Sequence, residues 1–392
     1  MTAVRAVDPS VTPSDEQAAA IKTIVAWYRD ARGPPEFYLA GYAGVGKSTV
    51  AALAIAELRD RCGVRTVRTA AFTGKAASVM RKKGVAGAQT LHSLIYTCVE
   101  DEDTGELRFA LSEASAAADA DLIVLDEVSM VNRPMADDLR SFGVKTLVMG
   151  DPGQLPPISG EGAFTSREPD VFLREIHRQA ADSPVIELAT LARQGKPLPV
   201  GFDRDGVRVL PLTRDTQPLI YRPDTQPLCG LNRVRWCYVQ RIRTLRGYAG
   251  ELPQVGERLI CGRNDRDEGL FNGGLGTLTA VSPTNDRKPG AFTLDVAMDD
   301  LAKPSTALAV DPHLFRQHFT NGLSEKLPPK RGEPWPHLYD WAAVLTAHKA
   351  QGSSWDDVTV VDDGHAFRDS RHLWRYTALT RSERALTVLV RP

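Results

Sequence analysis

The chain has 392 residues, which allows two or three domains at about 150 residues each. Its 48 basic and 49 acidic side chains give a net charge of −1, so a uniformly basic nucleic-acid coat is excluded and any polyanion-binding face must be a local patch. No apolar run approaches the roughly 18 residues of a membrane span, and the start of the chain lacks the apolar core of a signal peptide. The five cysteines form no CxxC pair, which disfavours a disulfide framework or a structural zinc site and is typical of a reducing cytoplasm.

The first 165 residues alternate apolar strand candidates with helix candidates. This alternation predicts a parallel α/β sheet, so the expected fold class is α/β. The strand candidates are 36–40, 64–70, 121–126 and 145–150, and the helix candidates are 17–29, 47–61, 75–82 and 135–142.

The pattern is interrupted between residues 93 and 119, where 94–99 and 106–111 are expected to pair as a small hairpin across an acidic turn. A second α/β pattern starts at about residue 171, and the segment 278–338 differs from it. Proline, glycine and short alternating pieces in that segment predict a small β-rich insertion. The strand candidates of the second pattern are 207–210, 258–261, 343–345, 358–361 and 386–390.

A complete phosphate-loop motif, G-x-x-x-x-G-K-[ST], stands at 41–48, after an apolar strand and before a helix. Its glycines let backbone N–H groups turn toward a phosphate, and the lysine is expected to reach the β- and γ-phosphates. The alternative is a glycine-rich turn with an exposed lysine. The candidate nucleotide-binding residues of this loop are Gly41, Gly44, Val45, Gly46, Lys47, Ser48 and Thr49.

Two later strand ends carry side chains suited to the same chemistry. Asp126 and Ser48 are expected to hold Mg²⁺, and Glu127 to polarise the attacking water. Gln154 ends a neighbouring strand and is expected to orient water or to sense the γ-phosphate. The alternatives are a solvated acidic strand end for the first pair and a Pro-Gly turn with a polar tip for the second.

Gln17 lies just upstream of the phosphate loop, in the sequence TPSDEQ at 12–17. Its amide is suited to reading an adenine edge. Ser14 with a glutamine three residues later is equally the signature of a capping box at a helix start. The residues alone leave both interpretations open.

Further segments follow one another in a fixed order: FTGKAA at 72–77, QTLHS at 89–93, REIHRQ at 174–179, GRND at 262–265, FNGGLG at 271–276, TAHKAQGS at 346–353 and YTALTR at 376–381. Together with the phosphate loop and the two strand-end motifs, they resemble the RecD-like 5′→3′ branch of superfamily 1 DNA helicases, especially the compact phage type such as Dda. The resemblance covers about 12–390. The chain departs from that family at Phe72, where proline is usual, and at Ser354, where glutamate is often found.

The resemblance implies two RecA-like motor domains with ATP in the cleft between them and Mg²⁺ as a second cofactor. It places the first motor domain at 1–93 and 120–170 with a β-hairpin pin at 94–119, and the second at 171–277 and 339–392 with an SH3-like β insertion at 278–338. The catalytic residues that it implies are Lys47, Glu127, Gln154, Arg178 and Arg381, with Gly352 as a further nucleotide contact. The DNA-binding residues that it implies are Thr73, Gly74, Lys75, Thr90, His92, Pro156, Asn264, Asn272, Thr346 and His348.

The expected function is that of an ATP-dependent DNA helicase that translocates 5′→3′ on single-stranded DNA and unwinds duplex, in phage or bacterial DNA replication, recombination or repair. The expected partners are single-stranded DNA and DNA forks, with a single-strand binding protein or other replication proteins as candidates. No membrane and no structural metal are expected, and the expected location is the cytoplasm, or the host cytoplasm for a phage-encoded chain.

The segment 232–246 carries five arginines and two aromatic residues, a composition that suits a polyanion. The alternative is an amphipathic helix with a solvated basic face. Two other classes of protein also stay open: a P-loop ATPase that remodels or packages without unwinding, and a non-catalytic nucleic-acid-binding module. Within the helicase class, RNA is an alternative substrate because backbone contacts distinguish the sugars poorly.

Overall fold

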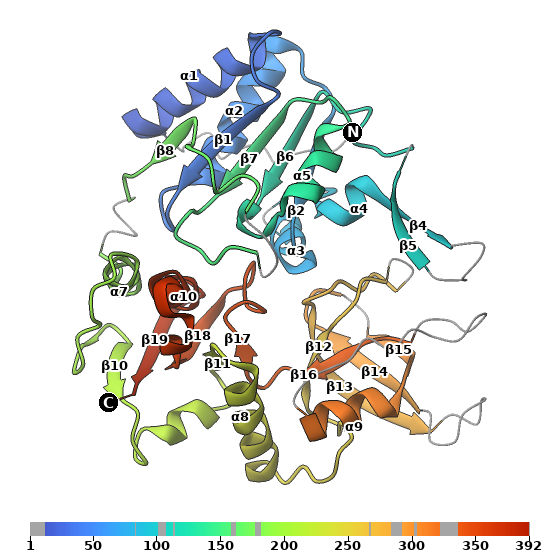
Figure 1. Ribbon diagram of the computed structural model, residues 1–392, viewed down its shortest axis with the longest axis vertical. Helices are drawn as coiled ribbons and strands as arrows, with labels where there is room; N and C mark the ends of the chain where they lie inside the picture. Colours follow the sequence, from blue (N-terminus) through green and yellow to red (C-terminus); the bar gives the residue numbers. More distant parts are fainter. Residues whose placement is uncertain are drawn as a thin grey trace. The chain divides into compact units, whose positions relative to one another are not determined.

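The computed structural model describes residues 12–82, 84–100, 107–112, 114–157, 162–176, 182–265, 268–283, 292–301, 304–321 and 336–391. The chain divides into two compact units (Figure 1). The first comprises Met1–Val99 with Arg108–Glu187, and the second comprises Glu100–Leu107 with Leu188–Pro392.

The first unit is built on a six-stranded sheet in the order β3-β2-β6-β7-β1-β8, and all its strand pairs are parallel. This confirms the parallel α/β sheet predicted from the strand–helix alternation. The strands are β1 (Glu36–Gly41), β2 (Val67–Ala71), β3 (Gln89–Thr90), β6 (Leu122–Asp126), β7 (Thr146–Gly150) and β8 (Val171–Leu173).

Helices cover both faces of this sheet, because side chains that alternate along each strand enter two different hydrophobic clusters. In β1, Phe37 and Leu39 join one cluster, and Tyr38 and Ala40 join the other. The helices of the unit are α1 (Asp15–Arg29), α2 (Lys47–Cys62), α3 (Gly74–Lys82), α4 (Leu91–Ile95) and α5 (Arg133–Arg140), with the 3₁₀ helix η1 (Val128–Met130); α7 (Pro184–Arg193) begins in the first unit and ends in the second.

Two boundaries of the first unit differ from the expectation. Strand β8, which we expected to open the second domain, pairs in parallel with β1, with Gly41 opposite Leu173. A three-residue apolar strand does not show in its own sequence which sheet it joins, so the boundary expected at residue 170 is wrong. The hairpin expected from residue 94 begins two residues later, because α4 extends to Ile95. Strands β4 (Tyr96–Glu100) and β5 (Leu107–Leu111) form a two-stranded sheet. The turn between them lies outside the described residues.

The second unit contains a six-stranded sheet in the order β17-β11-β18-β19-β10-β9, parallel except for the edge strand β9. Its strands are β9 (Asp203–Arg204), β10 (Val207–Pro211), β11 (Gln226–Cys229), β17 (Leu345–Thr346), β18 (Trp355–Asp362) and β19 (Ser382–Val390). Its helices are η2 (Gln217–Tyr221), α8 (Asn232–Leu245), η3 (Gly364–Ser370) and α10 (Arg371–Leu379).

A five-stranded antiparallel sheet, β15-β14-β13-β12-β16, belongs to the same unit. It is wider than the insertion expected at 278–338, because β12 and β16 pair with each other and place Leu259 opposite Trp341. The short apolar pattern of β12 resembles that of a parallel strand, and the family resemblance placed the segment from residue 339 onward in the second motor domain, so both strands were expected there. The elements are β12 (Arg258–Cys261), β13 (Leu275–Pro283), β14 (Phe292–Met298), β15 (Ser305–Val310) and β16 (Tyr339–Trp341), with α9 (Pro312–Asn321).

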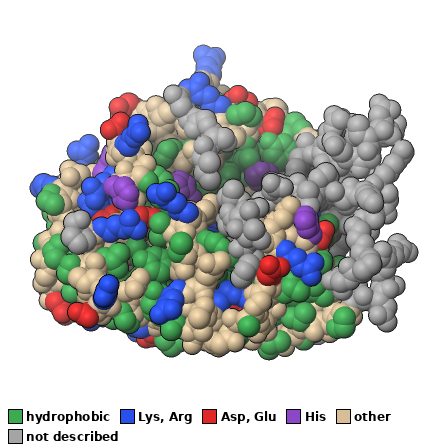
Figure 2. All heavy atoms as spheres, turned by 60° about the horizontal axis from the view of Figure 1, so that its bottom comes forward, with side chains coloured by type: hydrophobic (Ala, Val, Ile, Leu, Met, Phe, Trp, Pro, Cys, Tyr) green, Lys and Arg blue, Asp and Glu red, His purple; other side chains and the backbone are tan. Residues whose placement is uncertain are grey.

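Charged side chains are mixed with hydrophobic ones on the face of the molecule that Figure 2 shows. Lys and Arg side chains lie there in several separate groups, and Asp and Glu side chains lie close to some of them. This mixture agrees with a net charge of −1. Within the described ranges, no helix is long and apolar enough to cross a bilayer.

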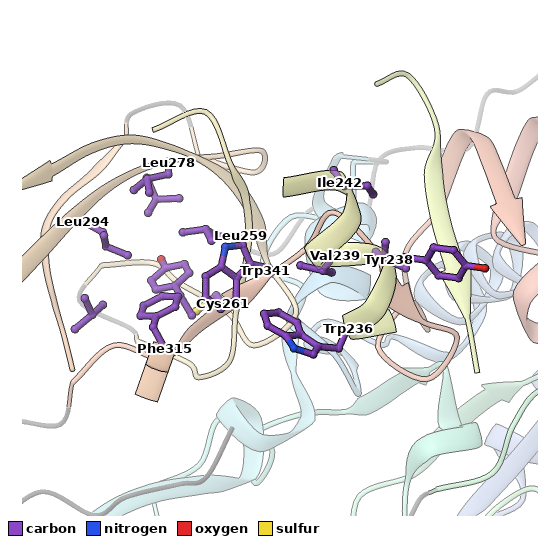
Figure 3. Close-up of a cluster of buried hydrophobic side chains, with 14 of the residues drawn as sticks. Trp236, Tyr238, Val239, Ile242, Leu259, Cys261, Leu278, Leu294, Phe315 and Trp341 are labelled. Carbon is purple, nitrogen blue, oxygen red and sulfur yellow. The ribbon is translucent and has the colours of Figure 1, made fainter. Parts of the chain in front are cut away.

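One hydrophobic cluster joins α8 to the antiparallel sheet, with Trp236 and Val239 on the helix and Leu259 and Trp341 on the sheet (Figure 3). The rings of Trp236 and Trp341 lie 5.3 Å apart, measured between their centroids. The helix and the sheet therefore share a core within the second unit.

Two arginines of α8 are buried beside this cluster, so neither contact with a polyanion nor the alternative of a solvated basic face holds for them. Arg235 is 0% exposed and pairs with Asp340, and Arg243 is 3% exposed and pairs with Glu257. Burial of a guanidinium requires such a partner, because an unpaired charge in the interior costs several kcal/mol, on the order of 3–5.

Candidate nucleotide site and DNA-contact residues

The phosphate loop connects β1 to α2 and needs glycine at three positions. Gly44 and Gly46 have φ of 83° and 80°, in the left-handed region that favours glycine. A Cβ on Gly41 would lie 2.7 Å from the Cγ2 atom of Val45, which is too close for another residue without a shift. Gly46 is the N-cap of α2 and provides no side-chain hydrogen bond. The loop therefore presents the start of a helix to solvent, which is the geometry of an anion site.

The ammonium group of Lys47 is held by its own loop. Its Nζ atom donates to the carbonyl oxygens of Gly41 at 2.6 Å and Tyr42 at 3.1 Å. These bonds keep the positive charge over the loop, where a phosphate can replace the carbonyl oxygens as acceptor. Ser48 is exposed on the first turn of α2, and Thr49 is half-buried beside it.

Gln17 forms the capping box, which confirms one of its two interpretations. Its backbone N–H donates to Oγ of Ser14 at 3.3 Å, and its Oε1 atom accepts from the Ser14 N–H at 3.1 Å. The side chain is 2% exposed, and its Nε2 atom donates to the carbonyl of Val45 at 3.2 Å. Gln17 thus fixes α1 against the phosphate loop, and its contact with adenine stays a prediction.

Asp126 and Glu127 lie at the carboxyl end of β6, on the same edge of the parallel sheet as the phosphate loop after β1. The Oδ1 atom of Asp126 accepts from the N–H of Glu127 at 2.8 Å. Glu127 has φ 55°, a left-handed conformation that costs a non-glycine residue roughly 1–3 kcal/mol. Strain of this kind persists where the surrounding structure requires the side chain in one direction, so Glu127 is a strong candidate for a functional residue.

The donor set suits Mg²⁺. The hydroxyl of Ser48 and the carboxylate of Asp126 are hard oxygen ligands, which Mg²⁺ prefers together with the oxygens of a nucleotide phosphate. These two residues would hold the ion.

Gln154 follows β7 in a turn that Asp151 stabilises. Oδ1 of Asp151 accepts from the Gly153 N–H at 2.9 Å, and the carbonyl of Asp151 accepts from the Gln154 N–H at 3.1 Å. The Gln154 side chain is 9% exposed, and its Oε1 atom is buried without a hydrogen-bond partner among the described residues. A buried acceptor in this state costs about 1–3 kcal/mol, so this oxygen favours a ligand or a water that supplies the missing donor.

The two predicted arginine fingers differ in what the structure shows. Arg178 lies outside the described residues. Arg381 is buried in the second unit, where its Nη1 atom donates to the Ser353 carbonyl at 3.2 Å and its Nε atom to the Thr377 carbonyl at 3.1 Å. Ser353 follows Gly352, whose φ of 74° is left-handed. The structure thus brings the last two motifs together, and contact of Arg381 with a γ-phosphate stays a prediction.

In the first unit, the predicted DNA-contact threonines are helix caps. Oγ1 of Thr73 accepts from the N–H of Ala76 at 3.1 Å at the start of α3. Thr90 forms a capping box with Ser93 at the start of α4. Of the other predicted DNA contacts in this unit, Gly74 is buried, Lys75 is half-buried and Pro156 is exposed. The caps orient the two helix starts on which the predicted DNA contacts lie.

His92 connects the first two of these motifs through ring contacts. Its ring lies 5.9 Å from that of Phe72 and 5.7 Å from that of Tyr96, measured between centroids. Burial lowers the pKa of His92 below its ordinary value. A neutral imidazole at pH 7 is expected to contact DNA by hydrogen bonding and stacking.

In the second unit, His348 packs against Phe367 with 5.7 Å between ring centroids, and burial lowers the pKa of His348 as well. The buried hydroxyl of Thr346 accepts from the N–H of Lys349 at 3.3 Å. Sequence reasoning missed Phe367, and no motif marks it.

Asn264 and Asn272 lie together at one end of the antiparallel sheet. The Oδ1 atom of Asn264 accepts from the backbone N–H of Asn272 at 2.8 Å. Both side chains are exposed, and an isolated bridge between Asp265 and Leu270 closes the loop between them.

Comparison with known proteins supports this reading of the motifs. A family model for the AAA domain matches residues 12–209, just over half of the chain, and a model for the UvrD-like helicase C-terminal domain matches residues 342–389. The ATP-dependent RecD2 DNA helicase of Deinococcus radiodurans is 27% identical over 395 residues, which cover 94% of this chain and 48% of that protein. The chain thus spans about half the length of this relative.

Two solved structures have a similar fold. Bacteroides Pif1 bound to ssDNA aligns with a TM-score of 0.57 at 19% identity, over 97% of this chain and 92% of that chain. Pif1 helicase from Candida albicans aligns with a TM-score of 0.52 at 19% identity, over 97% of this chain and 94% of that chain. The family resemblance seen in the motifs is confirmed. The chain belongs to the AAA domain family, carries a segment that matches the UvrD-like helicase C-terminal domain, and is similar to the RecD2 helicase in sequence and to the Pif1 helicases in fold.

Proposed function

We propose that the chain is an ATP-driven motor that moves 5′→3′ along single-stranded DNA and separates duplex DNA. The observation that carries this proposal is the set of side chains at one edge of the parallel sheet in the first unit. Lys47 lies on a glycine loop after β1, Asp126 and Glu127 end β6, and Gln154 follows β7. A phosphate-binding loop, a metal-ligand carboxylate, a base and a water-orienting amide are the groups that ATP hydrolysis requires.

Each of these residues has a defined task in the proposed reaction. The ammonium of Lys47 exchanges the carbonyls of Gly41 and Tyr42 for phosphate oxygens of ATP. Mg²⁺, held by Ser48 and Asp126, would supply charge neutralisation at the phosphates. The carboxylate of Glu127 accepts a proton from the attacking water, a step for which general bases contribute about 10²–10⁴ in rate.

Coupling to DNA is proposed to pass through the loop that carries Gln154. Its buried Oε1 atom lacks a donor among the described residues, and Pro156 is exposed two positions later. A change of hydrogen bonding at Gln154 therefore acts on a backbone segment with a predicted DNA contact. Since a ligand shifts only states that it binds unequally, the grip on DNA must differ between the ATP-bound and ATP-free forms.

The finer parts of the proposal come from the family resemblance. The 5′→3′ direction follows from Leu155-Pro156-Pro157 in the coupling motif, where 3′→5′ relatives carry an aromatic residue. The solved Pif1 relative bound to ssDNA supports DNA as the substrate. The roles of Arg178 and Arg381, of the β4–β5 hairpin as a pin, and of a single-strand binding protein as a partner are predictions of the same origin.

The test compares unwinding of 5′-tailed and 3′-tailed DNA duplexes, with and without ATP and with matched RNA tails. We expect ATP-dependent unwinding of the 5′-tailed DNA only. Lys47→Ala should abolish the ATPase activity that single-stranded DNA stimulates, whereas Lys22→Ala, at an exposed position on α1, should leave it unchanged. Unwinding by Lys47→Ala at the wild-type rate would refute the mechanism. An ATPase without stimulation by DNA would favour a remodelling or packaging motor.

A further inference from the structure

A pocket of about 610 Å³ lies in the second unit, and part of its wall comes from the basic segment 232–246. Its wall comes from η2, from one face of α8 and from the residue that follows β19. The residues that matter for its chemistry are Tyr221, Arg233, Cys237, Tyr238, Arg241 and Arg391. Its size is in the range of about 300–1,000 Å³ that ligand sites occupy.

The arginines of α8 fall into two sets. Arg235 and Arg243 are buried and paired with carboxylates, as described above. Arg233 and Arg241 are exposed at the pocket, and Arg391 is exposed opposite them. Across the described ranges, no carboxylate forms an ion pair with any of these three. The pocket therefore concentrates positive charge in a chain whose net charge is −1.

Two tyrosines add a flat, partly polar surface to the pocket. The rings of Tyr221 and Tyr238 lie 6.3 Å apart between centroids, with 53° between their planes. Tyr238 extends from α8 away from Trp236 and Trp341, with its hydroxyl pointing away from the hydrophobic cluster (Figure 3). The hydroxyl of Tyr221 lies within hydrogen-bonding reach of Arg241. The pocket thus combines guanidinium groups with an aromatic wall.

The spacing of the arginines indicates a ligand with more than one anionic group. Arg233 and Arg241 are eight residues apart on α8, which corresponds to about 12 Å along the helix axis. A single phosphate that bound both guanidinium groups would have to bring two positive charges close together, against their mutual repulsion. A polyanion with repeated phosphates satisfies them separately, and its bases can stack on tyrosine.

The position of the pocket in the sheet points to the same ligand. Strands β11, β17, β18 and β19 are parallel, so their carboxyl ends share one edge. Arg391 follows β19 and α8 follows β11 at that edge, where β17 also ends at Thr346, ahead of His348. Arg381 precedes β19, about 27 Å away along a nine-residue strand. The pocket therefore lies on the edge with the predicted DNA contacts, opposite Arg381.

We propose that this pocket is a second nucleic-acid site, which holds the phosphates and a base of a single strand that continues beyond the predicted contacts at Thr346 and His348. The proposal rests on the proposed function, since it needs a bound strand. Arg233, Arg241 and Arg391 bind phosphates, and Tyr221 supplies the stacking surface. The site adds contacts for long strands only.

The first test measures how the affinity for oligothymidylate depends on salt, at lengths of about 8 and about 24 nucleotides. The triple variant Arg233→Gln/Arg241→Gln/Arg391→Gln should lower the slope of log K against log salt by about 2 for the long strand, which is about 16-fold in affinity between 50 and 200 mM salt. The short strand should bind unchanged. The control Arg214→Gln/Arg316→Gln/Arg384→Gln removes three exposed arginines that lie outside the segment 232–246 and should leave both slopes unchanged.

The second test uses the exposed free thiol of Cys237 in the pocket wall. The long oligothymidylate should slow its modification by a maleimide at least several-fold, measured by peptide mass spectrometry, and the short one should not.

Equal slopes in both triple variants, or an unprotected Cys237 with the long strand bound, would overturn the proposal. Protection by an acidic peptide and not by DNA would overturn it in favour of a protein partner. A wild-type chain that binds no oligonucleotide would refute the proposed function as well, whereas intact binding with an unprotected pocket refutes this site alone.

Discussion

The carboxylate of Asp340 lies 2.9 Å from the ammonium of Lys349, the residue after His348. The same carboxylate lies 3.1 Å from the guanidinium of Arg235 on α8. Asp340 belongs to β16, so one buried side chain joins the antiparallel sheet, α8 and the loop of the predicted DNA contacts. A DNA strand that pulls on His348 would therefore act on a loop that Asp340 anchors to the antiparallel sheet.

Asp340→Asn should strongly destabilise the second unit. The change leaves the buried guanidinium of Arg235 without its carboxylate, and breaking a buried pair in this way costs about 3–5 kcal/mol. The free energy of unfolding in urea measures the loss. Asp356→Asn is the matched control, because Asp356 and Arg384 form a pair whose side chains are 63% and 76% exposed, and such pairs contribute about 1 kcal/mol or less. Equal losses in the two variants would contradict the role given to Asp340.

Glu127→Asn should slow ATP hydrolysis without lowering the free energy of unfolding. The variant lacks the carboxylate, so ATP hydrolysis should fall by about 10²–10⁴ while ATP still binds. Asparagine tolerates the left-handed backbone at this position better than most residues, so the unfolding free energy should not fall. Glu127→Val removes the same carboxylate with a β-branched side chain and should also lose roughly 1–3 kcal/mol of stability. Turnover, nucleotide affinity and urea unfolding distinguish the two, and a wild-type rate in either would exclude Glu127 as the base.

The phosphate loop was predictable because its chemistry and its backbone requirements lie in eight consecutive residues, 41–48. Glycines with left-handed φ, the lysine and the helix start all follow from that one stretch. The parallel sheet of the first unit was predictable for a similar reason, since buried strands such as β6 and β7 are apolar over most of their length.

The sequence of α8 alone did not predict which of its arginines form buried ion pairs. Arg233 and Arg235 look alike in the segment 232–246, yet only Arg235 is buried, because its partner Asp340 lies 105 residues later in the chain. The same limit applies to β8 and β12, whose short apolar patterns fit either of two sheets, and to β16, which has only three residues. Tertiary partners decide such cases, and a local pattern does not contain them.

Gln154→Leu should impair DNA-stimulated ATP turnover without lowering stability, whereas Asp340→Asn should lower stability. The variant removes a buried Oε1 atom that has no hydrogen-bond donor in the described structure, so the free energy of unfolding should stay equal or rise by up to about 1–3 kcal/mol. Stimulation of the ATPase by single-stranded DNA should be lost, because the variant lacks the amide that is proposed to sense the nucleotide. Gln240→Leu, at an exposed position of α8, is the control and should change neither quantity. A clear loss of stability in Gln154→Leu would show that the side chain is a structural element of the turn.

The stability of the chain should decrease as the pH falls below about 6.5, in part because of His92 and His348. Burial lowers the pKa of both side chains in the folded protein. The unfolded chain therefore binds more protons than the folded chain between the two pKa values, so stability is complete above the unfolded pKa and is lost as the pH falls toward the folded one. Urea unfolding of the wild type at pH 7.5, 6.5 and 5.5 gives the slope, and His92→Gln/His348→Gln should flatten it. His365→Gln, at an exposed position, should keep the wild-type slope. The other buried groups are common to all three proteins, so a difference in slope arises from the substituted histidines. Identical slopes in the double variant and the wild type would show that neither imidazole is held neutral by burial.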